Sequence, residues 1–416
     1  MKVQKADVMK SAKSLNHGDR SLQLKLFLRT LRETLIAFSF DIGGLFAGFM
    51  VASQLGVFQL SPWAIAIYPA IVSAKGVISG LLSGRLSTAL HIGTIYPSFL
   101  RNTQKFYRLV AALICLTLIT SVAMSSASLI FGIVFWGVNL ADFPAILLVV
   151  VATMVLGLLL TLVTIKVAFI TFEKGLDPDV VVYPIMSTVA DIFITFCYVL
   201  TLNLFFLIDI GKYALVLIGL LHIALVLYIL PRNFHAEEFM KTIRESLSTV
   251  LFVAIIVNIT GTVLKRISTI AEGRREIYTV YPALIDLVGD VGSVVGSTAT
   301  TKLALGLLRH SLASIKNHAL QIFGAWASSV VLFVVLAVLS LLMNALFELH
   351  LFLGIISTLL ITNIIAVATI VLLSYAVAIF TFQRGLDPDN FVIPIESSLA
   401  DSMTSLALLV ALILSG

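Results

Sequence analysis

Two aspartates at matching positions of a duplicated segment are the residues best suited to chemistry in this sequence. Asp191 ends the stretch TFEKGLDPDVVVYPIMSTVAD, and Asp401 ends TFQRGLDPDNFVIPIESSLAD; 13 of these 21 positions are identical. Apolar sequence follows both, so both carboxylates are expected inside membrane-embedded helices, where ionisable groups are costly and usually functional. The pair predicts a cation-binding site. The structural alternative is a pair of protonated or hydrogen-bonded aspartates.

The GLDPD sequence that opens both segments predicts the start of a helix. Asp177 and Asp387 suit the N-cap position, and Pro178 and Pro388 suit the first helical position. At 1.5 Å per residue, Asp191 then lies about 20 Å along its helix, near the middle of the bilayer. The duplication places its counterpart at the same depth.

A second, weaker pair of related segments gives the two copies unequal acidic content. These are YPAIVSAKGVISGLLSGRLSTALHIG (68–93) and YPALIDLVGDVGSVVGSTATTKLALG (281–306). In the second copy Asp286 and Asp290 are four residues apart and therefore share a helix face, among glycines that permit close backbone approach or a break. The first copy has Ser73 and Val77 at these positions. We expect a chemically asymmetric interior.

Three further polar residues interrupt apolar sequence. Asp41 is interpreted as another functional carboxylate, and Asn258 as a structural residue that joins helices through its amide. Three roles fit Lys75: a fixed positive charge that tunes a pathway, an amine that reaches the membrane surface, or a partner for an aspartate.

The composition indicates that this chain lies in a lipid bilayer. Of 416 residues, 59% are apolar and 12% are charged, whereas soluble proteins average about 25% charged residues. The net charge of +5 is modest and forms no nucleic-acid stripe. Cys115 and Cys197 both lie in apolar runs, which argues against a disulfide framework. The polar, basic first thirty residues do not resemble a cleavable signal peptide.

The hydropathy pattern predicts an all-α polytopic membrane protein with about eleven transmembrane helices. The predicted spans are 35–57, 62–90, 107–138, 142–171, 180–207, 212–231, 246–264, 278–308, 318–345, 350–381 and 391–415.

The duplication organises these spans into two five-helix repeats. We predict a cytoplasmic segment at 1–30, repeats at 31–208 and 243–416, and a linker helix with a cytoplasmic loop at 209–242. Five helices are an odd number, so the linker span is needed to make the repeats parallel. Parallel repeats are related by a pseudo-two-fold axis along the membrane normal. Such an axis predicts a pathway between the two copies, with matched residues facing each other.

Basic residues predict the orientation. With a cytoplasmic N-terminus in the cell membrane, most loops rich in Lys and Arg lie inside. The loop 265–277 dissents, because it is predicted outside yet contains Lys265, Arg266, Arg274 and Arg275.

Carboxylate, amide and backbone oxygens suit a hard cation. Mg²⁺ keeps several of its waters and usually binds one or two carboxylates, so a sparse aspartate pair fits it better than a full Ca²⁺ cage. Mn²⁺, Ca²⁺ and coupling to Na⁺ or H⁺ stay open. The histidines show no paired metal-ligand spacing, and no resident cofactor is expected.

At these motifs the sequence resembles the MgtE-type divalent cation transporters, and more closely the solute carrier family 41 proteins, which hold two MgtE-like units in one chain. The resemblance covers essentially the whole chain from about residue 31. It implies a magnesium pathway at the interface of the copies, with Asp191 and Asp401 matching the pore-lining aspartates. Asp290 matches the Asn of the family's GN pair, where the first copy has Val77. Bacterial MgtE carries cytoplasmic sensor domains that have no counterpart here.

An intramembrane aspartyl protease is the alternative from a different class. Two membrane aspartates and the tripeptide starting at Pro282 resemble that chemistry, but a duplicated DPD motif has no purpose in an acid–base dyad. A pseudo-dimer already supplies two copies of the site, so a monomer is sufficient, and further dimerisation stays open.

Overall fold

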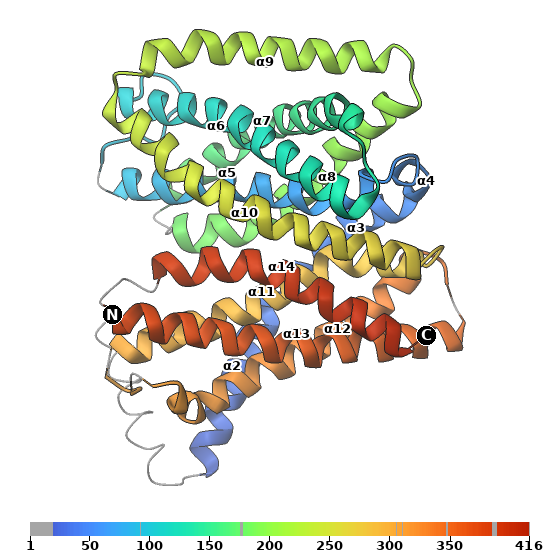
Figure 1. The fold of residues 1–416 in the computed structure, drawn as a ribbon. Helices are drawn as coiled ribbons and strands as arrows, with labels where there is room; N and C mark the ends of the chain where they lie inside the picture. The colour runs from blue at the N-terminus through green and yellow to red at the C-terminus, as the bar shows by residue number, and fades with distance from the viewer. Residues whose placement is uncertain are drawn as a thin grey trace. The chain divides into compact units, whose positions relative to one another are not determined.

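The protein is helical throughout the part of the chain that the computed structural model describes. That part comprises residues 20–91, 93–174, 178–304, 306–309, 311–346, 348–384 and 389–415. The main helices are α2 (Arg20–Phe38), α3 (Gly44–Ser53), α4 (Leu55–Phe58), α5 (Ala64–His91), α6 (Gln104–Phe131), α7 (Phe143–Glu173), α8 (Pro178–Phe206), α9 (Gly211–Asn233), α10 (Glu237–Ile270), α11 (Arg275–Ala304), α12 (Ala319–Met343), α13 (Leu349–Gln383) and α14 (Asp389–Ser415) (Figure 1). Short 3₁₀ or π segments are η1 (Ser39–Gly43), η2 (Gly132–Trp136), η3 (Leu140–Asp142) and η4 (Leu312–His318).

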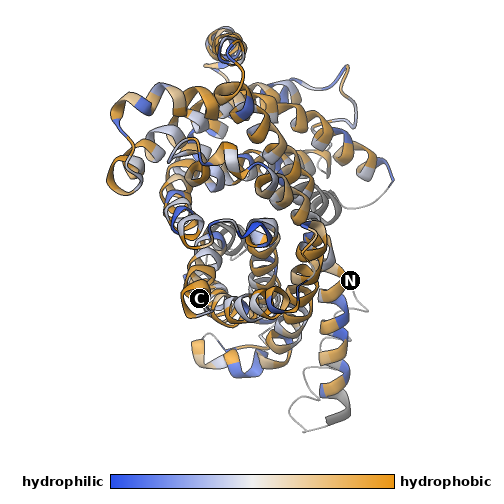
Figure 2. Ribbon diagram, turned by 90° about the vertical axis from the view of Figure 1, so that its right-hand side faces the viewer, coloured by the Kyte–Doolittle hydropathy of each residue, from blue (hydrophilic) through white to orange (hydrophobic). Residues whose placement is uncertain are grey.

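These helices confirm the predicted all-α membrane protein. Ten described segments are long and apolar enough to cross a membrane, and α14 adds the shorter apolar segment Leu399–Ser415. Figure 2 shows apolar residues along most of the helical ribbon. Both Gly- and Ser-rich spans, 62–90 and 278–308, are continuous helices, α5 and α11.

The chain divides into two compact units that exchange the first helices of the sequence repeats. Unit 1 comprises Met1–Ile42 and Ala283–Gly416, and unit 2 comprises Gly43–Pro282. Helix α2, from the first repeat, therefore belongs with the later helices of the second repeat. Helix α10, from the second repeat, belongs with the helices of the first. The repeat boundaries describe the duplication, whereas packing follows a different partition.

Within unit 1, α2 packs closely on α12. The hydroxyl oxygens of Thr34 and Ser328 lie 2.5 Å apart, and Ser328 also donates to the Leu31 carbonyl at 3.0 Å. A Cβ atom on Gly324 would come within 3.0 Å of the Thr30 side chain, so glycine permits this approach. Helix α2 begins at Arg20, well before the predicted span at residue 35.

Within unit 2, α10 packs on α5 and α6 through an equivalent polar contact. The Ser128 hydroxyl on α6 donates to the Asn258 amide oxygen at 2.8 Å, and the Asn258 amide nitrogen donates to the Ala254 carbonyl. A Cβ atom on Gly261 would lie 1.9 Å from the Ala66 carbonyl oxygen of α5, so only glycine fits. The structural interpretation of Asn258 is confirmed.

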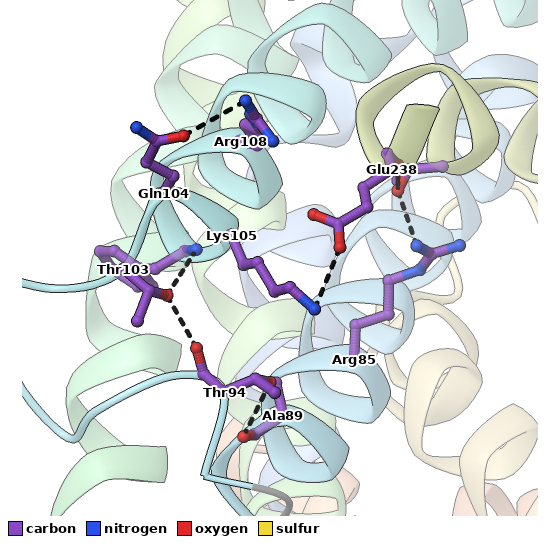
Figure 3. Close-up of polar contacts among 10 residues, drawn as sticks. Arg85, Ala89, Thr94, Thr103, Gln104, Lys105, Arg108 and Glu238 are labelled. Atoms are coloured by element: carbon purple, nitrogen blue, oxygen red, sulfur yellow. Dashed lines mark hydrogen bonds and ion pairs between the residues drawn. The ribbon is translucent and has the colours of Figure 1, made fainter. Parts of the chain in front are cut away.

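Polar contacts connect the first turns of α10 to α5 and to the start of α6. Arg85, at the end of α5, donates to Thr242 at 2.6 Å and pairs with Glu245 at 2.7 Å. Lys105, in the first turn of α6, pairs with Glu238 at 3.1 Å. Figure 3 shows Arg85 and Lys105 extending toward the same end of α10.

The C-terminal end of α10 explains part of the basic loop 265–277, which does not fit the predicted orientation. Lys265 lies inside α10, and its amine donates to the carbonyl of Trp136, whose indole donates to Thr262 at 2.9 Å. Arg274 pairs with Glu276 at 2.9 Å. Two of the four basic residues therefore have local structural partners.

Helix α9 is the predicted linker span. It packs on α6 and α7 within unit 2, at the edge seen at the top of Figure 1. Leu217, Leu220 and Leu221 are exposed on its outer face, as expected for lipid contact.

The exchange predicts a specific cross-link. In a variant lacking Cys115 and Cys197, Thr34→Cys with Ser328→Cys should form a disulfide under mild oxidation, because the two hydroxyl oxygens lie 2.5 Å apart. The measurement is the gel shift of protein carrying a protease site introduced between α9 and α10. Two fragments should remain joined after cleavage and separate on reduction.

Ser128→Cys with Asn258→Cys is the matched pair in unit 2, and each single cysteine is the negative control. Failure of both double variants to cross-link would contradict the exchanged packing.

Candidate cation-binding site

Asp191 is positioned by the packing of α8 on α5 in unit 2. The hydroxyl groups of Tyr68 on α5 and Thr195 on α8 lie 2.9 Å apart, and the Tyr198 hydroxyl donates to the Ala64 carbonyl at 2.5 Å. Asp191 lies one turn before Thr195, so it is on the α8 face turned toward α5. Its side chain is half-buried.

The DPD helix start is partly visible. Helix α8 begins at Pro178, as predicted, and the first described residue of α14 is Asp389. The predicted N-caps Asp177 and Asp387, with Pro388, lie outside the described residues.

Helix α11 carries the two acidic residues of the second copy without a break. It is continuous from Arg275 to Ala304, so the glycines do not interrupt it. Asp286 and Asp290 are both half-buried and, four residues apart, lie on one face. Of these glycines, Gly289 lies where α11 approaches α14.

One such approach relates Asp290 to Asp401 within unit 1. A Cβ atom on Gly289 would lie 3.7 Å from the Cβ of Ala400, which is ordinary van der Waals distance. Gly289 directly precedes Asp290, and Ala400 directly precedes Asp401. The contact between α11 and α14 therefore sets both carboxylates at one level along their helices. Asp401 is half-buried, and its carbonyl accepts from Ser405 at 2.7 Å.

Asp41 lies where α2 gives way to α3. It is 6% exposed in the 3₁₀ segment Ser39–Gly43, the last described part of unit 1 before the chain enters unit 2. Sequence reasoning placed it inside a single span, and the helix changes type at that point.

The five predicted site residues are divided unequally between the units. Asp41, Asp286, Asp290 and Asp401 belong to unit 1, and Asp191 belongs to unit 2. Among the described residues, no three His, Cys, Asp or Glu side chains group closely enough to hold one metal ion. The pathway between the copies stays a prediction from the sequence duplication.

Lys75 is enclosed in unit 2. It is 2% exposed, and its amine donates to the Thr161 hydroxyl of α7 at 3.5 Å. No ion pair joins it to a carboxylate in the part of the chain that the structure describes. Burial argues against an amine that reaches the membrane surface, and the pairing with an aspartate is not observed there.

Sequence reasoning missed a polar network at the end of α11. Lys302 lies 3.0 Å from Nδ1 of His318 and donates to Gln321 at 2.5 Å. Because an ammonium only donates, Nδ1 accepts, and Nε2–H donates to Thr298 at 3.0 Å. His318 is thus a neutral structural residue. The spacing of histidines along the sequence can indicate a paired metal site, but it does not reveal a hydrogen-bond network of this kind.

The α11–α14 approach predicts different outcomes for two matched glycines. Gly289→Leu should force α11 from α14 and lower the free energy of unfolding by about 1–3 kcal/mol. Gly289→Ala should be tolerated, because its Cβ fits at 3.7 Å. At Gly76, the counterpart in the first repeat, an added Cβ atom would meet no neighbour within 4 Å. Gly76→Leu should therefore be neutral or stabilising by up to about 1 kcal/mol. Thermal unfolding in detergent measures all three. Equal losses for both leucine variants would contradict the close approach.

Comparison with known families gives one result that fits this geometry. The family profile MgtE, described as a divalent cation transporter, matches residues 68–201 and again 281–411, together more than half of the chain. No curated protein and no solved structure matched the chain. The two matches coincide with the second to fifth helices of each predicted repeat and confirm the duplication. The chain is a multi-pass membrane protein that belongs to the MgtE family of divalent cation transporters.

Proposed function

We propose that this protein transports Mg²⁺ and that the carboxylates of Asp191 and Asp401 bind the partly hydrated ion. The observation that carries the proposal is the duplicated aspartate position. In each repeat a half-buried carboxylate follows the same DPD segment by the same distance, inside a membrane-embedded helix. A carboxylate in such a place is retained only where it has a task or a partner.

The sparse ligand set favours Mg²⁺ over Ca²⁺. Ca²⁺ takes six to eight oxygen ligands, whereas Mg²⁺ dehydrates reluctantly and is commonly held by one or two carboxylates and its own waters. The lack of a three-carboxylate cage among the described side chains fits the second pattern. Mn²⁺ or Ca²⁺ as the ion, and coupling to Na⁺ or H⁺, are the alternatives that flux measurements must separate.

The unequal distribution of acids suggests unequal roles for the repeats. Asp286 and Asp290 share a helix face, and Asp290 lies level with Asp401 across the α11–α14 contact. We propose that these carboxylates attract the cation toward Asp401, and that Asp41 contributes to the same acidic path. The first repeat offers Asp191 without equivalent acids on α5.

We propose a cytoplasmic N-terminus in the cell membrane. Most basic residues fall in loops that this orientation places inside. The structural partners of Lys265 and Arg274 weaken the one dissenting loop as evidence for the reverse orientation.

Charge removal at the duplicated position tests the function. Asp191→Asn and Asp401→Asn keep the side-chain shape, and each should reduce Mg²⁺ flux into proteoliposomes roughly tenfold or more, because a neutral amide binds a hard divalent cation poorly. Flux is followed with a trapped Mg²⁺-sensitive dye.

Asp209→Asn, an exposed aspartate between α8 and α9, is the matched control and should retain wild-type flux. Gel-filtration profiles and thermal midpoints of all variants check folding. Wild-type flux in both membrane variants would overturn the proposed sites. Transport of Mn²⁺ or Ca²⁺ in preference to Mg²⁺ would overturn the proposed ion.

A further inference from the structure

The first helices of the two repeats share a sequence motif but differ in charge. TLRETL (30–35) in α2 matches TIRESL (242–247) in α10. Around this motif, residues 25–36 include three basic residues and one acid, whereas the matching residues 237–248 include two basic residues and three acids. The net charge is therefore +2 in the first repeat and −1 in the second.

In unit 2 the acids of α10 neutralise basic residues of the neighbouring helices. Glu245 pairs with Arg85 of α5 at 2.7 Å. Glu238 pairs with Lys105 of α6 at 3.1 Å, as Figure 3 shows. Lys241 also lies 3.8 Å from Glu245 within α10. This end of unit 2 thus balances much of its positive charge with its own carboxylates.

The matching end of unit 1 has a larger excess of positive charge. Residues 20–36 and 302–318 contain one acid, Glu33, which pairs with Arg29 at 2.9 Å within α2. The basic residues of these two segments are Arg20, Lys25, Arg29, Arg32, Lys302, Arg309 and Lys316. Seven basic residues and one acid give a net charge of +6. We call the described residues of these two segments the basic end of unit 1.

Packing on α12 places α2 in this group. The rings of Phe27 and Phe323 have centroids 6.3 Å apart, and two turns further along each chain Thr34 meets Ser328. Helix α2 therefore runs beside α12 in the same direction (Figure 1). Its basic first half lies next to the start of α12.

The end of α11 and the segment η4 reach the same start of α12. Lys302 of α11 donates to Gln321 at 2.5 Å and lies 3.0 Å from Nδ1 of His318, the last residue of η4. The carbonyl of Arg309 accepts from the Ser314 hydroxyl of η4 at 2.8 Å. The basic end is thus one region of unit 1, built from three segments.

The outer surface of this region combines charge with apolar side chains. Lys25, Arg32 and Lys316 are exposed, and none of the three forms an ion pair within the part of the chain that the structure describes. Leu24 and Leu28 of α2 are 57% and 50% exposed. Such a surface suits the boundary between acyl chains and headgroups, because leucines enter the hydrocarbon while long basic side chains reach the phosphates.

We propose that the basic end of unit 1 binds the phosphate groups of anionic phospholipids in the cytoplasmic leaflet. Clusters of about four to eight Lys and Arg residues beside a transmembrane helix attract such lipids. The basic residues of α2 precede the predicted span 35–57, and the proposed cytoplasmic N-terminus places them at the leaflet that carries anionic lipid. Lipid phosphates then supply the negative charge that carboxylates supply in unit 2.

The exposed leucines favour a lipid over a soluble phosphate compound as the source of these phosphates. A soluble compound would use the charges alone, whereas a phospholipid also covers Leu24 and Leu28 with its acyl chains. The inference concerns a lipid partner and does not depend on the identity of the transported ion.

The test measures phospholipid binding to the purified full chain in detergent by native mass spectrometry. Phosphatidylserine and phosphatidylcholine with identical acyl chains are the probes. The wild type should retain phosphatidylserine in preference, and the preference should weaken as ionic strength rises from about 0.05 M to about 0.5 M. Arg29→Gln with Arg32→Gln should lower the affinity for phosphatidylserine roughly fivefold for each charge removed. Lys316→Gln alone should lower it roughly fivefold.

Matched controls separate this surface from general charge loss. Lys241→Gln with Arg244→Gln changes the same two motif positions in α10 and should retain the wild-type affinity. Arg29→Lys with Arg32→Lys keeps both charges and should also bind phosphatidylserine. Glycerophosphoserine, the headgroup without acyl chains, should displace little lipid at equal concentration. Gel-filtration profiles and thermal midpoints check the folding of each variant, and Lys316→Gln provides a separate single change outside α2.

Three results would overturn the inference. Equal retention of both phospholipids by the wild type would exclude recognition of anionic lipid. Equal losses in the glutamine variants of α2 and α10 would exclude the basic end of unit 1 as the binding surface. Displacement by glycerophosphoserine at equal concentration would indicate a site for soluble phosphate compounds instead. These measurements involve no ion flux, so their outcome is separate from that of the proposed transport function.

Discussion

Hydrogen bonds between helices inside the membrane determine how this chain is assembled. Ser128 with Asn258, and Thr34 with Ser328, join the first helix of each repeat to helices of the other repeat. Lipid offers no donors or acceptors, so these groups must find partners within the protein. Each such bond is worth only about 0.6–1.7 kcal/mol. Their value lies in specifying which surfaces meet, together with Gly261 and Gly324, which allow the backbones to approach.

The duplication has preserved the frame and altered the chemistry. Asp191 and Asp401 occupy matching positions, and the α5–α8 pair repeats as α11 and α14. At matched positions, the second copy has Asp286 and Asp290 where the first has Ser73 and Val77, and it has Val288 where the first has Lys75. A pathway built from such copies is not required to treat an ion identically from both sides. Different residues at matched positions of two similar repeats are a simple way to make the two sides of a pathway chemically different.

Much of the fold could be predicted because lipid imposes a strong length and hydropathy rule. The spans matched the helices within a few residues except at α2 and α10. Helix α2 continues back to Arg20 through a basic first half that the hydropathy pattern did not include. Helix α10 runs from Glu237 to Ile270, nine residues before and six residues beyond the predicted span 246–264. The role of Asn258 was predicted because a buried amide needs a partner. The exchange of helices could not be predicted, because a repeat shows common descent and carries no information about packing. The burial of Lys75 with its hydrogen bond to Thr161 of α7 could not be predicted, because the two residues are distant in sequence.

Helix exchange also constrains the history of the chain. A polypeptide with one repeat could not complete a compact unit of this kind, since the first helix of that unit comes from the other copy. A single-repeat protein with the same packing would have to associate in pairs, with the first helix of each copy packed on the other. Two such repeats joined in one chain associate intramolecularly, so that their packing no longer depends on protein concentration. In one chain the two copies can carry different residues, such as a lysine in one and an acidic pair in the other, whereas a mutation in a homodimer alters both halves at once.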